Sequence, residues 1–156
     1  MRTQAEKAEA FRALHARPRA FIIPNPYDVG TARMLARLGF EALATTSAGF
    51  AFSAGLLDNQ VGRERMLAHV AQIADATDLP VSADLENGFG DGPETVAETI
   101  RLAASTGIVG GSIEDSIDRP GEKVYDLGLA TDRIRAAVEA KHALPFPFTL
   151  TARAEN

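Results

Sequence analysis

The sequence contains no cysteine. This absence excludes a disulfide scaffold, thiolate zinc sites and a cysteine nucleophile. Long apolar runs are also missing. The N-terminal stretch MRTQAEKAEAFRALHARP mixes charged and apolar residues, unlike a secretory signal, and no later run is long enough to span a bilayer. We therefore expect a cytoplasmic protein.

Positive charge is scarce as well. The chain has 16 Lys and Arg against 21 Asp and Glu, for a net charge of −5. This balance provides no basic surface for nucleic acid and argues against binding to anionic membranes. The 156 residues, 46% of them hydrophobic, suffice for one domain with a sizeable core. We predict a single domain over residues 1–156, with neither a nucleic-acid nor a membrane partner.

Helical and strand-like hydrophobic periods alternate along the chain, which predicts a parallel α/β fold. The predicted helices cover residues 4–16, 28–38, 62–76, 94–105 and 131–142, and the predicted strands cover residues 21–25, 41–46, 79–84, 108–114 and 146–153.

The length of the chain allows two architectures. Five strands could form a complete doubly wound, flavodoxin-like sheet. They could also be the first five units of a (βα)8 TIM barrel, which usually needs about 250 residues. A dinucleotide-binding sheet is disfavoured because Gly88, Gly90 and Gly92 lack the spacing of the GxGxxG fingerprint.

Charged residues gather at the carboxyl ends of three predicted strands. Side chains two apart share a face of a strand, so Asp84 lies with Glu86, and Arg153 with Glu155. Glu114 ends the intervening strand on its polar face. In a barrel, the carboxyl ends of the strands build the active site, so we expect these five side chains to surround one mouth.

Such a cluster of acids needs neutralisation, because buried like charges repel one another. Oxygen ligands without cysteine or histidine suit Mg²⁺, with Mn²⁺ as an alternative. The acids could instead cap helices and face water. We expect surface or packing roles for His15, His69 and His142, and capping roles for Asn25 and Asp28, although Asn25 could reach the mouth.

Four segments at the ends of predicted strands carry a family resemblance: ALATTSAGFAFSAG, SADLENGFG, GGSIEDS and TARAEN. In this order and spacing they resemble the isocitrate lyase/phosphoenolpyruvate mutase superfamily. The resemblance implies a (βα)8 barrel that is often a homo-oligomer. It also implies action on a small carboxylate substrate, a 2-oxo acid or phosphonate. A C–C or C–P bond would be broken or formed beside the carbonyl through a pyruvate enolate.

The same resemblance assigns roles to individual residues. Asp84, Glu86 and Glu114 would surround Mg²⁺, directly or through water. Arg153 would bind the substrate carboxylate or phosphonate through its planar guanidinium. Backbone N–H groups would assist around Ser47, Ala48 and Gly49.

Two loops bear on the reaction type. The lyases of the superfamily carry an acid cysteine in a Lys-Arg-Cys-Gly-His loop, whereas the corresponding segment here keeps Lys123 and has no cysteine. Isocitrate or methylisocitrate cleavage by the usual mechanism is therefore not expected. Asp58 matches the catalytic aspartate of the mutase branch, but a turn role is equally open. Decarboxylase, hydrolase, mutase and lyase activities all remain open.

The chain is shorter than the barrel that it resembles, by about three βα units. It could be part of a longer protein, or it could complete its fold by association. A catalytically silent barrel segment that dimerises or serves as an interaction module is therefore a second hypothesis. A flavodoxin-like binding domain is a third.

Overall fold

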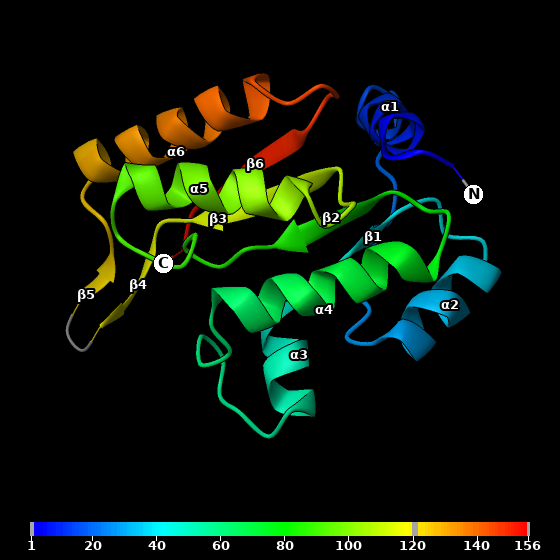
Figure 1. Ribbon diagram of the computed structural model, residues 1–156, viewed down its shortest axis with the longest axis horizontal. Helices are drawn as coiled ribbons and strands as arrows, with labels where there is room; N and C mark the ends of the chain where they lie inside the picture. The colour runs from blue at the N-terminus through cyan, green and yellow to red at the C-terminus, as the bar shows by residue number, and fades with distance from the viewer. Residues whose placement is uncertain (1, 120–121, 156) are drawn as a thin grey trace.

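Helices and strands alternate through most of the computed structural model, which describes residues 2–119 and 122–155 (Figure 1). The helices are α1 (Gln4–His15), α2 (Val29–Arg37), α3 (Ser47–Ser53), α4 (Arg63–Ala76), α5 (Pro93–Ala104) and α6 (Leu127–His142). The strands are β1 (Leu43–Ala44), β2 (Val81–Asp84), β3 (Gly110–Glu114), β4 (Ser116–Arg119), β5 (Glu122–Val124) and β6 (Thr149–Arg153).

The main sheet has four parallel strands in the order β1-β2-β3-β6, which is also their order along the chain. A doubly wound sheet reverses its strand order at a switch point, whereas a barrel adds each strand beside the previous one. The predicted partial TIM-type barrel is therefore confirmed, and the flavodoxin-like alternative is wrong.

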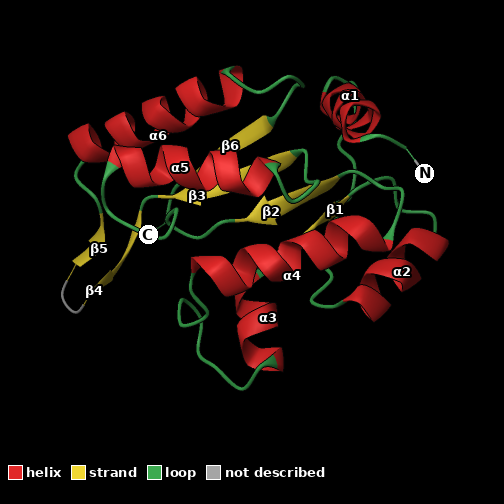
Figure 2. Ribbon diagram, viewed as in Figure 1, coloured by secondary structure: helices red, strands yellow, loops and turns green. Residues whose placement is uncertain are grey.

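The helices α4, α5 and α6 cover one face of this sheet (Figure 2). The apolar side chains of that face are fully buried against them, including Val81, Ala83, Leu85 and Ile113. The opposite face carries the alternating polar residues and lines a cavity. This one-sided covering leaves the polar face for the site.

Helix α1 contacts the chain at the amino-terminal ends of the strands. The Gln4 side-chain amide donates to the carbonyl oxygens of Ala104 (2.7 Å) and Ile108 (2.8 Å). The Lys7 ammonium donates to the carbonyl oxygen of Thr77 (2.8 Å), just beyond α4. The bonds to Thr77 and Ala104 satisfy carbonyls that the ends of α4 and α5 leave without helical partners. Helix α1 thus closes the end of the sheet opposite to its polar mouth.

The predicted strand over residues 21–25 is wrong. This segment is extended but belongs to no strand, and it joins β1 through one backbone bond, from the N–H of Ala44 to the carbonyl of Pro24 (3.1 Å). Pro24 and Pro26 lack the N–H that a sheet ladder requires, which explains the missing pairing. The sheet consequently has four strands instead of five.

The segment after β1, which none of the predicted helices covers, is helix α3. Its N-cap is Thr46, whose hydroxyl oxygen accepts the N–H of Gly49 (3.1 Å). Helix α6 also differs from the prediction, because it begins at Leu127 instead of Thr131. Asp126 caps it by accepting the N–H of Leu129 (3.1 Å). The N-cap residues Thr46 and Asp126 thus mark helix starts that the hydrophobic period alone did not locate.

The antiparallel pair of β4 and β5 was not predicted either. It follows β3 and leads through Tyr125 into α6. In the part of the chain that the structure describes, no helix has the length and apolarity needed to cross a membrane.

Candidate active site

A cavity of about 420 Å³ opens on the polar face of the sheet, at the carboxyl ends of its strands. Polar side chains from all four strands or the segments after them line it, namely Thr45, Thr46, Ser82, Asp84, Ser112, Glu114, Thr151 and Arg153. Six of the nine predicted site residues take part: Ser47, Ala48, Asp58, Asp84, Glu114 and Arg153. Of the five side chains that strand alternation grouped at one mouth, Asp84, Glu114 and Arg153 line this cavity, whereas Glu86 and Glu155 do not.

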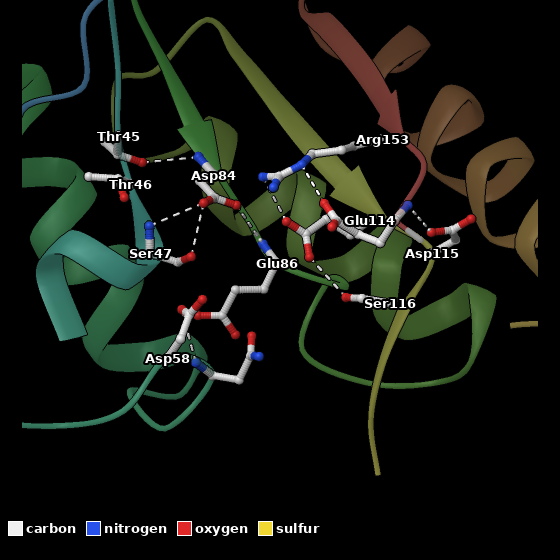
Figure 3. Close-up of polar contacts among 12 residues, drawn as sticks. Thr45, Thr46, Ser47, Asp58, Asp84, Glu86, Glu114, Asp115, Ser116 and Arg153 are labelled. Atoms are coloured by element: carbon white, nitrogen blue, oxygen red, sulfur yellow. Dashed lines mark hydrogen bonds and ion pairs between the residues drawn. The ribbon is translucent and has the colours of Figure 1, made fainter. Parts of the chain in front are cut away.

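Four hydrogen bonds hold Asp84 in the cavity (Figure 3). One carboxylate oxygen accepts the N–H (3.1 Å) and the hydroxyl (2.9 Å) of Ser47, and the other accepts the N–H of Glu86 (3.2 Å). The N–H of Asp84 donates to the Thr45 hydroxyl oxygen (3.0 Å). These contacts tie the end of β2 to the start of α3 and fix the direction of the carboxylate.

Glu114 and Arg153 form the second polar group. The Arg153 guanidinium lies 2.8 Å from a carboxylate oxygen of Glu114 and 2.6 Å from one of Glu155, and the Ser116 hydroxyl donates to Glu114 (2.9 Å). Burial raises the pKa of Glu114, and the nearby carboxylate of Asp84 raises it further, against the lowering effects of Ser116 and Arg153. Burial is thus the main reason that the charged form of Glu114 is disfavoured.

Glu86 does not join this group. It is only 5% exposed and has a left-handed backbone, with φ of 51°. It lines a neighbouring cavity of about 480 Å³ with Asn59, Arg63 and Ser116, and its side chain leads away from Arg153 (Figure 3). The alternation that put Glu86 beside Asp84 does not apply, because β2 ends at Asp84 and the chain turns there.

The three predicted metal ligands are therefore divided between two cavities. Among the described residues, no three His, Cys, Asp or Glu side chains stand close enough together to hold an ion directly. The donors present still fit Mg²⁺ or Mn²⁺, because Asp84 and Glu114 offer oxygen atoms only and Mg²⁺ commonly keeps several waters. The repulsion between these two acids would also fall if a cation lay between them.

Two of the three backbone N–H groups expected to bind substrate already have partners within the protein. The N–H of Ser47 donates to Asp84, and that of Gly49 donates to Thr46. A Cβ atom at Gly49 would lie 2.6 Å from the Cγ2 atom of Thr46, so this position accepts only glycine without a shift. Ala48 lines the cavity.

The remaining predicted residues lie in different surroundings. Asp58 lines the cavity and also accepts the N–H of Asn59 (3.1 Å) in a turn, so both of its expected roles have a structural counterpart. Lys123 is exposed on β5 and lines neither cavity. Nothing in the sequence indicated that Lys123 would lie on a β-hairpin, away from the carboxyl ends of the main-sheet strands.

Sequence reasoning missed Thr45 and Ser116, which bind Asp84 and Glu114. Ser116 could have been found, because it follows Glu114 by two residues. Asn25 lines the cavity, and its side-chain amide donates to the carbonyl of Ala44 (3.2 Å). Of the two positions expected for Asn25, a helix cap or the mouth, the structure shows the mouth.

Packing and capping roles are confirmed elsewhere. Asp28 caps α2 by accepting the N–H of Thr31 (2.6 Å). His69 is buried and stacks on Phe50, with ring centroids 3.7 Å apart. His142 and His15 are both exposed, and His15 also packs edge-on against Phe11 and Phe21 and lines the cavity.

A polar cavity at the carboxyl ends of parallel strands, added one after another, is the active-site arrangement of βα-barrel enzymes. A family model described as phosphoenolpyruvate phosphomutase matches residues 11–156. The chain therefore belongs to this family, within the isocitrate lyase/phosphoenolpyruvate mutase superfamily, as the four sequence segments predicted.

Individual relatives agree with this assignment. The 2-methylisocitrate lyase of Salmonella typhimurium is 30% identical over 141 residues, which cover 85% of this chain and 48% of the relative. A Burkholderia cenocepacia J2315 crystal structure described as a lyase/mutase is 67% identical, with a TM-score of 0.97, and the match covers 98% of this chain and 55% of that one. Oxaloacetate acetylhydrolase in complex with its product oxalate is 32% identical, with a TM-score of 0.89 and coverage of 99% and 55%.

The chain spans about half the length of the curated relatives that it matches. The relatives with named activities are lyases, a mutase and a hydrolase of small carboxylates, which supports an enzymatic role in general.

Proposed function

We propose that this chain provides the metal- and substrate-binding side of a Mg²⁺-dependent enzyme that acts on a small 2-oxo acid or phosphonate. The reaction breaks or forms a C–C or C–P bond beside the carbonyl, through an enolate. One observation carries the proposal: Asp84, Glu114 and Arg153 line a single cavity at the carboxyl ends of β2, β3 and β6.

In this proposal, Asp84 and Glu114 hold the cation, and Glu86 contributes through water from the adjacent cavity. When bound, the cation supplies positive charge opposite the oxyanion that develops on the substrate carbonyl. The Ser47 hydroxyl and N–H keep the Asp84 carboxylate in place for this role.

Arg153 binds the substrate carboxylate by exchanging one of its present acid partners. Its side chain is 49% exposed, and that of Glu155 is 35% exposed, so this pair is partly screened by water. An ion pair of this kind contributes roughly 0–1 kcal/mol, which makes the exchange inexpensive. Glu114 is more deeply buried and stays with the cation.

Asp58 is the candidate for holding or moving a proton, because it lines the same cavity. A role for Lys123 requires the β4–β5 hairpin to approach the mouth. The absence of cysteine distinguishes the chain from the lyases that use an acid cysteine, although 2-methylisocitrate lyases are among its relatives. Decarboxylation, hydrolysis, mutase chemistry and C–C cleavage are all compatible with the cavity.

The test is calorimetric titration of the 156-residue chain with Mg²⁺ and then with oxalate, an enolate mimic that a relative binds as its product. We expect oxalate to bind only when Mg²⁺ is present. Asp84→Ala should abolish this binding, whereas the matched control Asp132→Ala, at an exposed acid on α6, should preserve it. Oxalate binding that is independent of Mg²⁺ and of Asp84 would refute the proposal.

Self-association is a second candidate property. In the described sheet, β1 pairs with one strand only, β2. Edge strands with open backbone groups bind further strands. We propose that the chain forms homo-oligomers, either as part of the enzyme or as a silent interaction module. Sedimentation velocity over a hundredfold range of protein concentration tests this proposal, and one concentration-independent monomeric species would refute it.

A further inference from the structure

Arg133 on α6 is a fully buried arginine, only 1% exposed. Its guanidinium donates to the carbonyl oxygens of Gly90 (2.6 Å), Asp91 (2.5 Å) and Asn87. All three carbonyls belong to the loop between β2 and α5, which begins directly after Asp84. A single side chain from a distant helix therefore satisfies three backbone carbonyls of this loop.

Tyr125 holds the same loop from a second side. Its ring lies 4.1 Å below the Arg133 guanidinium, and its hydroxyl donates to a carboxylate oxygen of Asp91 (2.7 Å). The hydroxyl also accepts from the side-chain amide of Asn87 (3.2 Å). The N–H of Tyr125 donates to the carbonyl of Asp115 (2.9 Å), just after β3. Tyr125 thus connects the loop to the β4–β5 hairpin and to the end of β3.

The loop has a conformation that its own residues disfavour. Glu86 (φ 51°) and Phe89 (φ 62°) are both left-handed without being glycine. Such backbone states persist only where the surrounding structure imposes them. The contacts from Arg133 and Tyr125 lie between and beyond these two residues, so they are placed to impose the strained path.

We propose that Arg133 and Tyr125 are positioning residues that hold the β2–α5 loop in the shape that directs Glu86 into the cavity beside the active site. Arg133 does not line the active-site cavity, so it acts on the site through the loop. This inference rests on the proposed function in its claim that Glu86 contributes to the metal site. The claim about loop conformation is independent of that function.

Hydrogen exchange of the loop amides tests the conformational claim. The N–H of Gly88 donates to Leu85 and that of Phe89 to the Asn87 side chain, so both report on the folded loop. In Arg133→Lys, which keeps the charge but not the planar fork, we expect these amides to exchange about tenfold faster. Arg135→Lys, an exposed arginine on the same helix, is the matched control and should leave them unchanged.

The amides of α4 provide the internal reference, because the hydrogen bonds of Arg133 go to the β2–α5 loop and its guanidinium lies over the ring of Tyr125. Acceleration confined to the loop supports the proposal. Equal acceleration in the loop and in α4 would indicate general destabilisation and would overturn it, as would unchanged loop amides. If Arg133→Lys does not fold, Tyr125→Phe decides by the same criterion, because it keeps the ring and removes only the hydroxyl bonds to Asp91 and Asn87.

Electron paramagnetic resonance of Mn²⁺ tests the link to the site. We expect the dissociation constant of Mn²⁺ to rise about tenfold in Arg133→Lys and to stay constant in Arg135→Lys, because the loop no longer holds Glu86 in place. Unchanged Mn²⁺ affinity with a loosened loop would refute the positioning role. If the unmodified chain binds no Mn²⁺, the proposed function fails and the positioning role with it, whereas the exchange data still decide the conformational claim.

Discussion

The hydrogen bond between the Ser47 hydroxyl and Asp84 should stabilise the fold measurably. The distance is 2.9 Å, Ser47 is buried, and the acceptor is a carboxylate that also accepts two backbone N–H groups. Hydrogen bonds to charged groups contribute about 1.5–3 kcal/mol, and the open cavity reduces this value. We therefore expect Ser47→Ala to lower the free energy of unfolding by about 1–2 kcal/mol.

Asp84→Ala should lower the free energy of unfolding by less than the loss of its hydrogen bonds alone would suggest. Removing this carboxylate also removes its repulsion of Glu114, whose pKa it raises. The fold should therefore survive a change that abolishes metal binding, which is typical of residues that serve function at the expense of stability.

A double-mutant cycle in urea separates these contributions. We expect Ser47→Ala and Asp84→Ala to be non-additive by about 1 kcal/mol or more, because both remove the same bond. Ser53→Ala is the control in the same helix, since its hydroxyl donates to a backbone carbonyl at an exposed site. Additivity of Ser47→Ala and Asp84→Ala to within about 0.5 kcal/mol would show that the bond contributes nothing and would refute the reasoning.

Three further predictions concern the substrate, the pH dependence and the packing. Arg153→Lys should raise the oxalate dissociation constant about tenfold or more, because an ammonium cannot replace the planar fork; unchanged calorimetric affinity would remove Arg153 from the site. Burial lowers the pKa of His69 in the folded chain, so the unfolded chain binds more protons near the ordinary histidine pKa. The free energy of unfolding should therefore fall as the pH drops below about 6.5. Urea midpoints that stay level in this range, or that fall equally in His69→Phe, would contradict this prediction. Gly49→Ala should destabilise by about 1–3 kcal/mol through the 2.6 Å contact with Thr46, whereas Gly30→Ala, with its nearest contact at 3.4 Å, should not; equal thermal midpoints would refute the difference.

Strand alternation located the polar mouth as far as the regular strands reach. Ser112 and Glu114 line the cavity and Asp115 does not, as the period of two predicts. The same rule was wrong at Glu86, because the backbone enters the left-handed region two residues after β2 ends. The two-residue alternation predicts side-chain positions correctly as long as the backbone is a regular strand. It cannot predict a turn that contacts with distant side chains impose.

The buried Arg133 illustrates that limit. In the sequence it is one of two arginines on a predicted helix, and nothing nearby distinguishes it from the exposed Arg135. Only the packing of α6 against α5 brings it to the loop carbonyls after β2. The hairpin of β4 and β5, which carries Lys123 away from the mouth, likewise depends on pairing between segments that have weak individual preferences.

By itself, the sequence determined the order of five helices (α1, α2, α4, α5 and α6) and of the four strands of the main sheet, the apolar and polar faces of β2, β3 and β6, and the family. These features follow from local period and from motifs that lie at strand ends. The tertiary structure decided which acids share a cavity, which backbone N–H groups are already bonded, and how the loop that carries Glu86 is held. These features depend on contacts between residues tens of positions apart, such as Ser47 with Asp84 and Arg133 with Gly90. Their geometry is set by how the elements pack, which no short segment of the chain specifies.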